Sequence, residues 1–193
     1  MRSTEDLSTP ARIRDAAIRE FAAQGFSVGV RAIASRAGVA PGLVNHHFGG
    51  KAGLQDRCDE QVVRHLLELK AAGELDVQSI AAHFAPAEDG PLPYAAYARR
   101  MLEHGSARAD ALFDALVDGT RRTLADQQRA GAMRADLDVD ALAPVLTVYG
   151  LAPVMMPGLL ARAVGASSLD ADALAQAAQT LAPVLQGGLV AGR

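Results

Sequence analysis

The chain has 193 residues, half of them apolar, and a formal net charge of −3 at pH 7, which allows one or two compact units with a sizeable core. Abundant alanine and leucine with few aromatic residues favour an all-α fold, and the single cysteine, Cys58, excludes an internal disulfide. The polar segment 1–8 lacks the apolar core of a signal peptide, so we expect a disordered arm there and a reducing, cytoplasmic location.

Residues 30–51 form the most informative stretch. Ile33 and Ala34 line the inner side of a short predicted helix, and Gly38 follows where a left-handed residue ends a helix. A second helix is predicted to begin at Pro41, with an apolar side of Leu43, Val44 and Phe48 and an opposite side of Gly42, Asn45, His46 and His47. This layout is typical of a helix-turn-helix, whose second helix enters the major groove of DNA. A helical hairpin with no role in nucleic-acid binding has the same spacing and is the alternative.

Lys51 opens the next predicted helix, whose apolar positions are Leu54, Cys58, Val62 and Leu66. A cation at a helix N-terminus opposes the helix dipole, which is explained if a DNA phosphate binds there; an exposed, solvent-screened lysine is the alternative. Seven cations and three anions between residues 10 and 57 leave a balance of +4 on a chain of net charge −3. This modest basic head predicts weak non-specific DNA affinity at physiological salt.

The following segments predict a helical body. We expect a helix capped by Asp76 that runs through Val77, Ile80 and Phe84, and then a loop over residues 86–93. A helix from Pro93 to His104 and a long helix from Ser106 to Gly131 come next. Asp136, Asp138 and Asp140 alternate with apolar residues without completing a calcium loop, so they predict a turn and a cap before a helix that starts near Val139.

The last third contains two runs without charge, residues 141–161 and 173–192. Their length raises the possibility of a membrane span. Prolines in the first run, glutamines in the second and the lack of basic flanks favour two helices that are covered on more than one side. One side would pack on the body and another on a second subunit, and we expect no membrane contact.

Residues 12–54 resemble the N-terminal domain of the TetR family of bacterial repressors. In the first helix and its end the matching residues are Ile13, Ala16, Ala17, Phe21, Gly25 and Phe26. In the second helix and the turn they are Arg31, Ile33, Ala34, Ala37, Gly38 and Val39. In the recognition helix and the start of the next they are Gly42, Leu43, His47, Phe48, Lys51 and Leu54.

The resemblance implies a three-helix helix-turn-helix domain over residues 9–52 and a helical ligand-binding and dimerisation domain over residues 53–193. It also implies a homodimer formed through the last two helices, which would present two recognition helices to a near-palindromic operator in double-stranded DNA. In this family the body holds a small-molecule pocket, so we expect a repressor relieved by a small, mainly apolar effector.

Three departures from the family pattern bear on DNA binding. The usual Thr or Ser pair that caps the second helix is Val28-Gly29, and Ser27 is a possible substitute cap. Ala40 replaces a phosphate-facing hydroxyl, and Asn45 replaces a tyrosine that normally contacts the DNA backbone. A helical small-molecule sensor with lost or altered DNA recognition is therefore the alternative function.

The predicted DNA-contacting residues are Arg31, Ala40, Pro41, Gly42, Leu43, Asn45, His46, His47 and Lys51. We expect Asn45 and His46 to contact bases, His47 and Lys51 to contact phosphates, and Leu43 to meet a thymine methyl group. The predicted pocket residues are Phe84, Tyr97, Met101, His104, Phe113, Leu116, Tyr149 and Met155, for each of which ordinary core packing is the alternative. No pattern of catalytic, cofactor-binding or metal-ligating residues is present, so we expect neither an enzyme nor a bound metal or cofactor.

Overall fold

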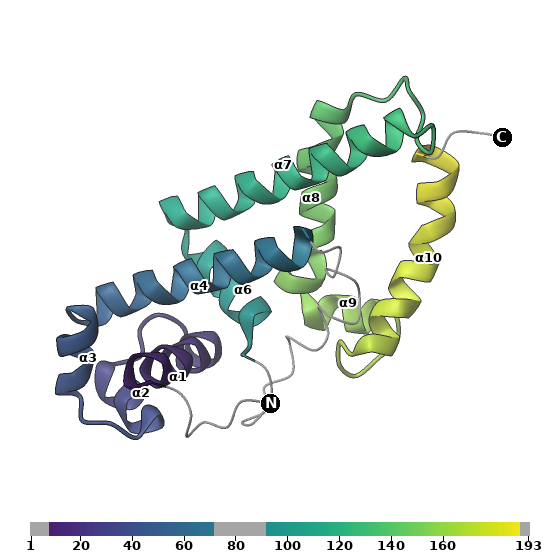
Figure 1. The fold of residues 1–193 in the computed structure, drawn as a ribbon. Coiled ribbons are helices and arrows are strands. Elements are labelled where there is room, and N and C mark those ends of the chain that lie inside the picture. The colour runs from purple at the N-terminus through teal and green to yellow at the C-terminus, as the bar shows by residue number, and fades with distance from the viewer. Residues whose placement is uncertain (1–7, 72–91, 190–193) are drawn as a thin grey trace. The chain divides into compact units, whose positions relative to one another are not determined.

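The computed structural model describes residues 8–71 and 92–189, and all elements assigned within these ranges are α-helices (Figure 1). The chain forms two compact units: unit 1 comprises residues 1–66 and 83–109, and unit 2 comprises residues 67–82 and 110–193. The predicted helix at Asp76, Val77, Ile80 and Phe84 and most of the predicted loop 86–93 lie outside the described residues. The all-α prediction is confirmed for the part of the chain that is described.

Unit 1 contains five helices: α1 (Thr9–Gln24), α2 (Val30–Ala37), α3 (Gly42–Phe48), α4 (Lys51–Ala71), which runs on into unit 2, and α6 (Tyr94–His104). Helices are present before and after the turn as predicted, but the second begins at Gly42, with Pro41, its predicted first residue, at the N-cap position. Four of these helices, α1, α2, α4 and α6, each supply large, fully buried side chains: Ile13, Phe21, Ile33, Leu54 and Tyr97. From α3, Val44 is also fully buried and anchors that helix.

The turn between α2 and α3 has the predicted geometry. Gly38 is left-handed, with φ of +65°, and the amide of Val39 donates to the carbonyl of Ala34 over 3.0 Å. The guanidinium of Arg12 on α1 donates to the carbonyl of Ala37 over 2.7 Å, which satisfies one of the open carbonyls at this helix end. The α2 terminus is therefore held from outside the motif as well as by the glycine.

The predicted cap at the start of α2 was wrong. Gly29, and not Ser27, occupies the N-cap position, and no side-chain hydrogen bond caps the helix. Ser27 is two residues too early, because the N-cap residue must directly precede the first helical residue for its side chain to reach the open amides. Val28 is buried at this point and fixes the approach of the chain by packing.

Three of the four predicted apolar positions of α4, those of Leu54, Cys58 and Val62, have no exposed surface, and the fourth, Leu66, is half-buried. The Cys58 thiol donates to the carbonyl of Arg14 over 3.7 Å, and burial raises the pKa of this thiol. A protonated, buried thiol is a poor nucleophile, so packing between α1 and α4 accounts for this residue.

A buried polar contact joins α4 to α6. The Tyr97 hydroxyl donates to Asp59 Oδ1 over 2.6 Å, and Arg108 Nε lies 3.9 Å from Asp59 Oδ2. Asp59 is only 5% exposed, and desolvation raises its pKa above the ordinary 3.8, while the Tyr97 hydrogen bond opposes that shift. The charged carboxylate is therefore costly here and depends on its donors.

Replacing Tyr97 by phenylalanine is expected to lower the free energy of unfolding by about 1–3 kcal/mol at neutral pH, because a buried carboxylate loses its donor. A protonated Asp59 needs that donor less. The loss of unfolding free energy should therefore shrink as the pH falls through the pKa of Asp59, which lies above the ordinary value of 3.8. Urea unfolding at neutral and acidic pH measures both effects, with Arg122→Gln, at an exposed site of α7, as the control. An equal loss at both pH values would show that the charge of Asp59 plays no part.

Unit 2 is built from α7 (Ala107–Arg129), α8 (Val139–Met155), α9 (Pro157–Ala163) and α10 (Ala171–Leu189). The predicted start of α8 is confirmed, because Asp138 Oδ1 accepts from the amides of Asp140 and Ala141 over 3.0 and 3.1 Å. The predicted start of α7 at Ser106 is also confirmed, because the Ser106 hydroxyl accepts a hydrogen bond from the amide of Ala109. A core of Val117, Leu124, Met133 and Ala143 joins α7 to α8.

The prediction of two helices in the last third was wrong, since three are present within the described residues. The first charge-free run divides at Met156, whose φ of −131° and ψ of 50° are not helical. The following Pro157 disfavours the helical conformation at this residue and then begins α9. Within the described residues no single helix has the length and apolar character to cross a membrane, although α8 and α9, bent by 90° at their break, together meet that criterion.

Candidate DNA-binding surface

The second helix of the motif turns its polar side outward. Asn45, His46 and His47 are exposed, whereas Val44 is fully buried and Leu43 and Phe48 are half-buried. Ala40, Pro41 and Gly42, at the N-terminal end of the helix, are exposed as well. Within unit 1, α3 lies beside α2 and the beginning of α4 (Figure 1). Seven of the nine predicted DNA-contacting residues thus belong to one short exposed element and its leading turn.

The two remaining predicted contacts flank α3 and are cations. Arg31 is exposed in the first turn of α2, and Lys51 is the first residue of α4. Neither forms an ion pair within residues 8–71 and 92–189. Other cations of unit 1 are bound to the protein itself: Arg36 Nε lies 2.5 Å from Glu20 Oε1, and Arg57 Nη1 lies 2.8 Å from Glu60 Oε2. The sequence count of basic charge therefore overstates what this surface offers to a polyanion.

A glycine that the sequence analysis did not single out sets the distance between α3 and α4. A Cβ atom built on Gly53 would overlap the carbonyl oxygen of Phe48, the last residue of α3. The obstacle is backbone, so it cannot rotate away. An isolated glycine in a predicted helix is the signal that could have found this close approach.

The residues predicted for a ligand pocket divide between the two units. In unit 1, Tyr97 and Met101 are buried and His104 is exposed; the rings of Tyr97 and His104 lie 5.4 and 5.5 Å from Phe26. In unit 2, Leu116 is buried, Phe113 and Met155 are half-buried, and Tyr149 is 71% exposed. Phe84 lies outside the described residues. Tyr97 and His104 of unit 1 therefore pack against Phe26, just after the end of α1. The ligand pocket itself stays a prediction.

Exposed apolar side chains gather in unit 2. Val145, Val148 and Tyr149 follow each other at intervals of three and one residues along α8 and are 52%, 57% and 71% exposed. Met156 and Leu159, beside and within α9, and Leu181 of α10 are at least half exposed. The large apolar side chains that are at least half exposed, among the described residues, thus all belong to unit 2.

Comparison with known proteins is consistent with this arrangement. The family described as "Bacterial regulatory proteins, tetR family" matches residues 13–58, and "Tetracyclin repressor-like, C-terminal domain" matches residues 89–186. The HTH-type transcriptional regulatory protein RaaS of Mycobacterium tuberculosis is 40% identical over 152 residues, covering 78% of this chain and 71% of RaaS.

Solved structures show the same fold. A TetR transcriptional regulator from Chloroflexus aurantiacus has a TM-score of 0.68 at 19% identity, with both chains fully covered. SmeT, the repressor of the Stenotrophomonas maltophilia multidrug efflux pump SmeDEF, has a TM-score of 0.66 at 20% identity, covering 98% of this chain and 93% of SmeT.

Proposed function

This chain belongs to the TetR family and is a DNA-binding transcriptional regulator, and from that premise we propose that it represses transcription as a homodimer bound to a near-palindromic operator. The observation that carries this proposal is the exposed face of α3 between two cations, Arg31 and Lys51, that have no ion-pair partner within the described residues. A cytoplasmic location follows from a chromosomal target. We keep the predicted division into an arm over residues 1–8, a DNA-binding domain over residues 9–52 and a ligand-binding and dimerisation domain over residues 53–193.

The chemistry of the α3 face assigns different roles to its residues. Asn45 has an amide that can pair with adenine through two hydrogen bonds, and the neighbouring His46 is exposed as well. Gly42 and Pro41 present little bulk, which allows close approach of the helix N-terminus to the DNA. His47, Lys51 and Arg31 lie at the edges of this face and are assigned to phosphates, which fix the register of the helix in the groove.

The dimer is proposed to form through the exposed apolar surface of unit 2. Val145, Val148 and Tyr149 of α8 would be covered there by the second copy, together with Leu159 of α9 and Leu181 of α10. A twofold interface uses the same patch on both subunits, and so it places two copies of α3 in symmetric positions. The family match over residues 89–186 supports this assignment.

Operator binding tests the roles of Asn45 and Lys51. Lys51→Ala is expected to weaken binding to all DNA sequences alike and to reduce the slope of log affinity against log salt by about one, because one phosphate contact is lost. Asn45→Ala is expected to relax the base preference at one position by about 1–3 kcal/mol. Gel shifts over a salt series, with wild-type and mutated operator fragments, measure both.

The matched control is Arg122→Ala, which removes an exposed cation from α7. It should leave both the salt slope and the base preference unchanged. If wild-type protein retards no fragment from the region upstream of its own gene, the small-molecule sensor that lacks DNA recognition becomes the better description. If neither Asn45→Ala nor Lys51→Ala has an effect, the residue roles given above are wrong.

The effector is proposed to be a small, mainly apolar compound held by the C-terminal domain. Phe113, Leu116 and Met155 of unit 2 remain the candidates for its contacts, whereas the burial of Tyr97 and Met101 in unit 1 favours a packing role for those two. Relief of repression requires that the effector bind more tightly to the conformation that does not fit the operator. A compound that raises the melting temperature but fails to release the operator would contradict this mechanism.

A further inference from the structure

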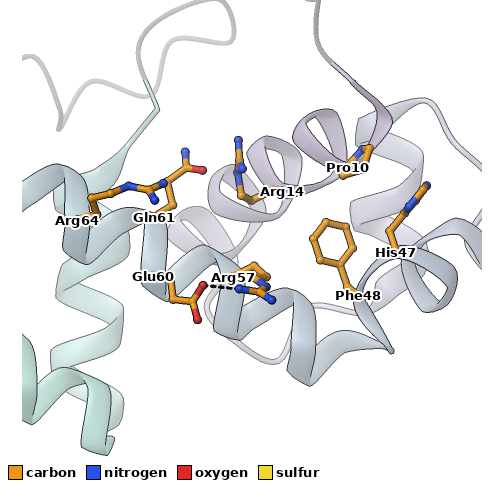
Figure 2. A pocket seen from close by; sticks show the side chains of 8 residues that line it. All are labelled: Pro10, Arg14, His47, Phe48, Arg57, Glu60, Gln61 and Arg64. Atoms are coloured by element: carbon orange, nitrogen blue, oxygen red, sulfur yellow. Dashed lines mark hydrogen bonds and ion pairs between the residues drawn. The ribbon is translucent and has the colours of Figure 1, made fainter.

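Unit 1 carries a surface hollow, and of the residues that line it only His47 has a role in the functions described above. It has a volume of about 260 Å³ and is lined by Pro10 and Arg14 of α1, His47 and Phe48 of α3, and Arg57, Glu60, Gln61 and Arg64 of α4. Figure 2 shows the Phe48 ring near its centre, with Arg14, Arg57 and His47 around the ring and Arg64 farther along α4. Three helices, α1 and the neighbouring pair α3 and α4, thus build one concave site.

The lining is strongly cationic. Three arginines and a histidine face one carboxylate, that of Glu60, which Arg57 already engages over 2.8 Å. Arg14 reaches Asp15 only over 3.4 Å, and its buried Nε has no hydrogen-bond partner. Arg64 is exposed and forms no ion pair with any residue in the described ranges. An anion bound in the hollow would relieve the mutual repulsion of these cationic groups.

The shape of the site favours a compact ligand over a DNA strand. A duplex backbone is convex and meets protruding cations, whereas here the cations surround a hollow with an aromatic ring within it. The volume is below the usual range for drug-sized ligands, about 300–1,000 Å³. Phe48 and Pro10 offer apolar contact beside the charges, so the fitting ligand combines an anionic group with a small ring.

We propose that this hollow binds a small organic anion that carries a phosphate or carboxylate on an apolar ring. The ligand would contact His47 and Phe48, which belong to the helix assigned to DNA. On the proposed function, its binding would therefore act on operator affinity directly within unit 1. The anion would be a second regulatory ligand, separate from an effector of the C-terminal domain.

Phenyl phosphate is the probe, added to the full-length protein without DNA at constant ionic strength and followed by the amide chemical shifts of Phe48 and Gln61. We expect saturable shifts and an affinity roughly tenfold higher than that of inorganic phosphate, which lacks the ring. Arg64→Gln and Arg14→Gln should each weaken phenyl phosphate binding by roughly tenfold. Arg122→Gln removes the same charge from α7 and should have no effect.

Arg64 is exposed, so its substitution is expected to leave the fold intact. Absence of saturable shifts, or an equal loss in Arg122→Gln, would overturn the proposal. It would also be overturned if Arg64→Gln lowered operator affinity and its salt slope while phenyl phosphate did not bind, because the hollow would then serve the DNA backbone. The probe is titrated without DNA, so its failure is distinguishable from a failure of operator binding.

Discussion

Gly53→Ala is expected to reduce operator affinity by about two orders of magnitude while the protein stays folded. The added methyl group would overlap the carbonyl oxygen of Phe48, so the end of α3 or the start of α4 must move. Overpacking of this kind lowers the free energy of unfolding by about 1–3 kcal/mol. The better helix propensity of alanine offsets about 1 kcal/mol of this loss. Folding therefore survives, but α3 is displaced, and each bidentate base contact that it loses is worth about 1–3 kcal/mol.

The control is Gly158→Ala in α9, because nothing lies within 4 Å of a Cβ at this position and the residue is outside the DNA-contacting surface. Its free energy of unfolding should equal or exceed that of the wild type. Thermal unfolding separates stability from DNA affinity, which is measured by fluorescence anisotropy of a labelled operator. Wild-type operator affinity in Gly53→Ala would show that the spacing of α3 and α4 is not what positions the recognition helix.

Val148→Asp is expected to convert the proposed dimer to a monomer and to remove specific operator binding with it. An interface anchor contributes about 2 kcal/mol or more, and a twofold axis repeats the change on the partner, for a total of about 4 kcal/mol. That total corresponds to a dimer dissociation constant about a thousandfold higher. A monomer binds a single operator half-site and therefore lacks the increase in affinity that a dimer obtains by binding two half-sites at once.

The folding of the single chain should not suffer, because Val148 is 57% exposed there. Sedimentation velocity across a concentration series measures the association. Ala111→Asp places the same charge on an exposed position of α7 and should leave the dimer intact. A Val148→Asp protein that remains dimeric would place the interface on another surface.

Much of the DNA-binding motif could be predicted because its determinants are local. Gly38 marks a left-handed helix end, the apolar spacing of Leu43, Val44 and Phe48 separates an inner from an outer side, and Lys51 begins the next helix. The face of α4 followed from the spacing of Leu54, Cys58 and Val62 in the same way. In each of these cases the residue type and its distance along the chain are sufficient to fix the structure.

The features that could not be predicted depend on residues far apart in the sequence. The bond from Arg12 to the Ala37 carbonyl joins positions 25 residues apart, and periodicity carries no information about it. The contact between Tyr97 and Asp59 spans 38 residues and needs two folded helices to form. The break at Met156, in contrast, has a local signal, because Pro157 favours the start of a new helix. This signal was missed because the absence of charge over residues 141–161 favoured one continuous helix.

The pairing of basic residues within unit 1 bears on how the protein would find its target in a chromosome. With Arg36 held by Glu20 and Arg57 by Glu60, fewer positive groups than the sequence count suggests are left for non-specific attraction to the double helix. Sliding along the duplex depends on that attraction. The protein should therefore find its operator mostly by repeated collisions from solution. Its residence time should be short at non-specific sites and long at the operator.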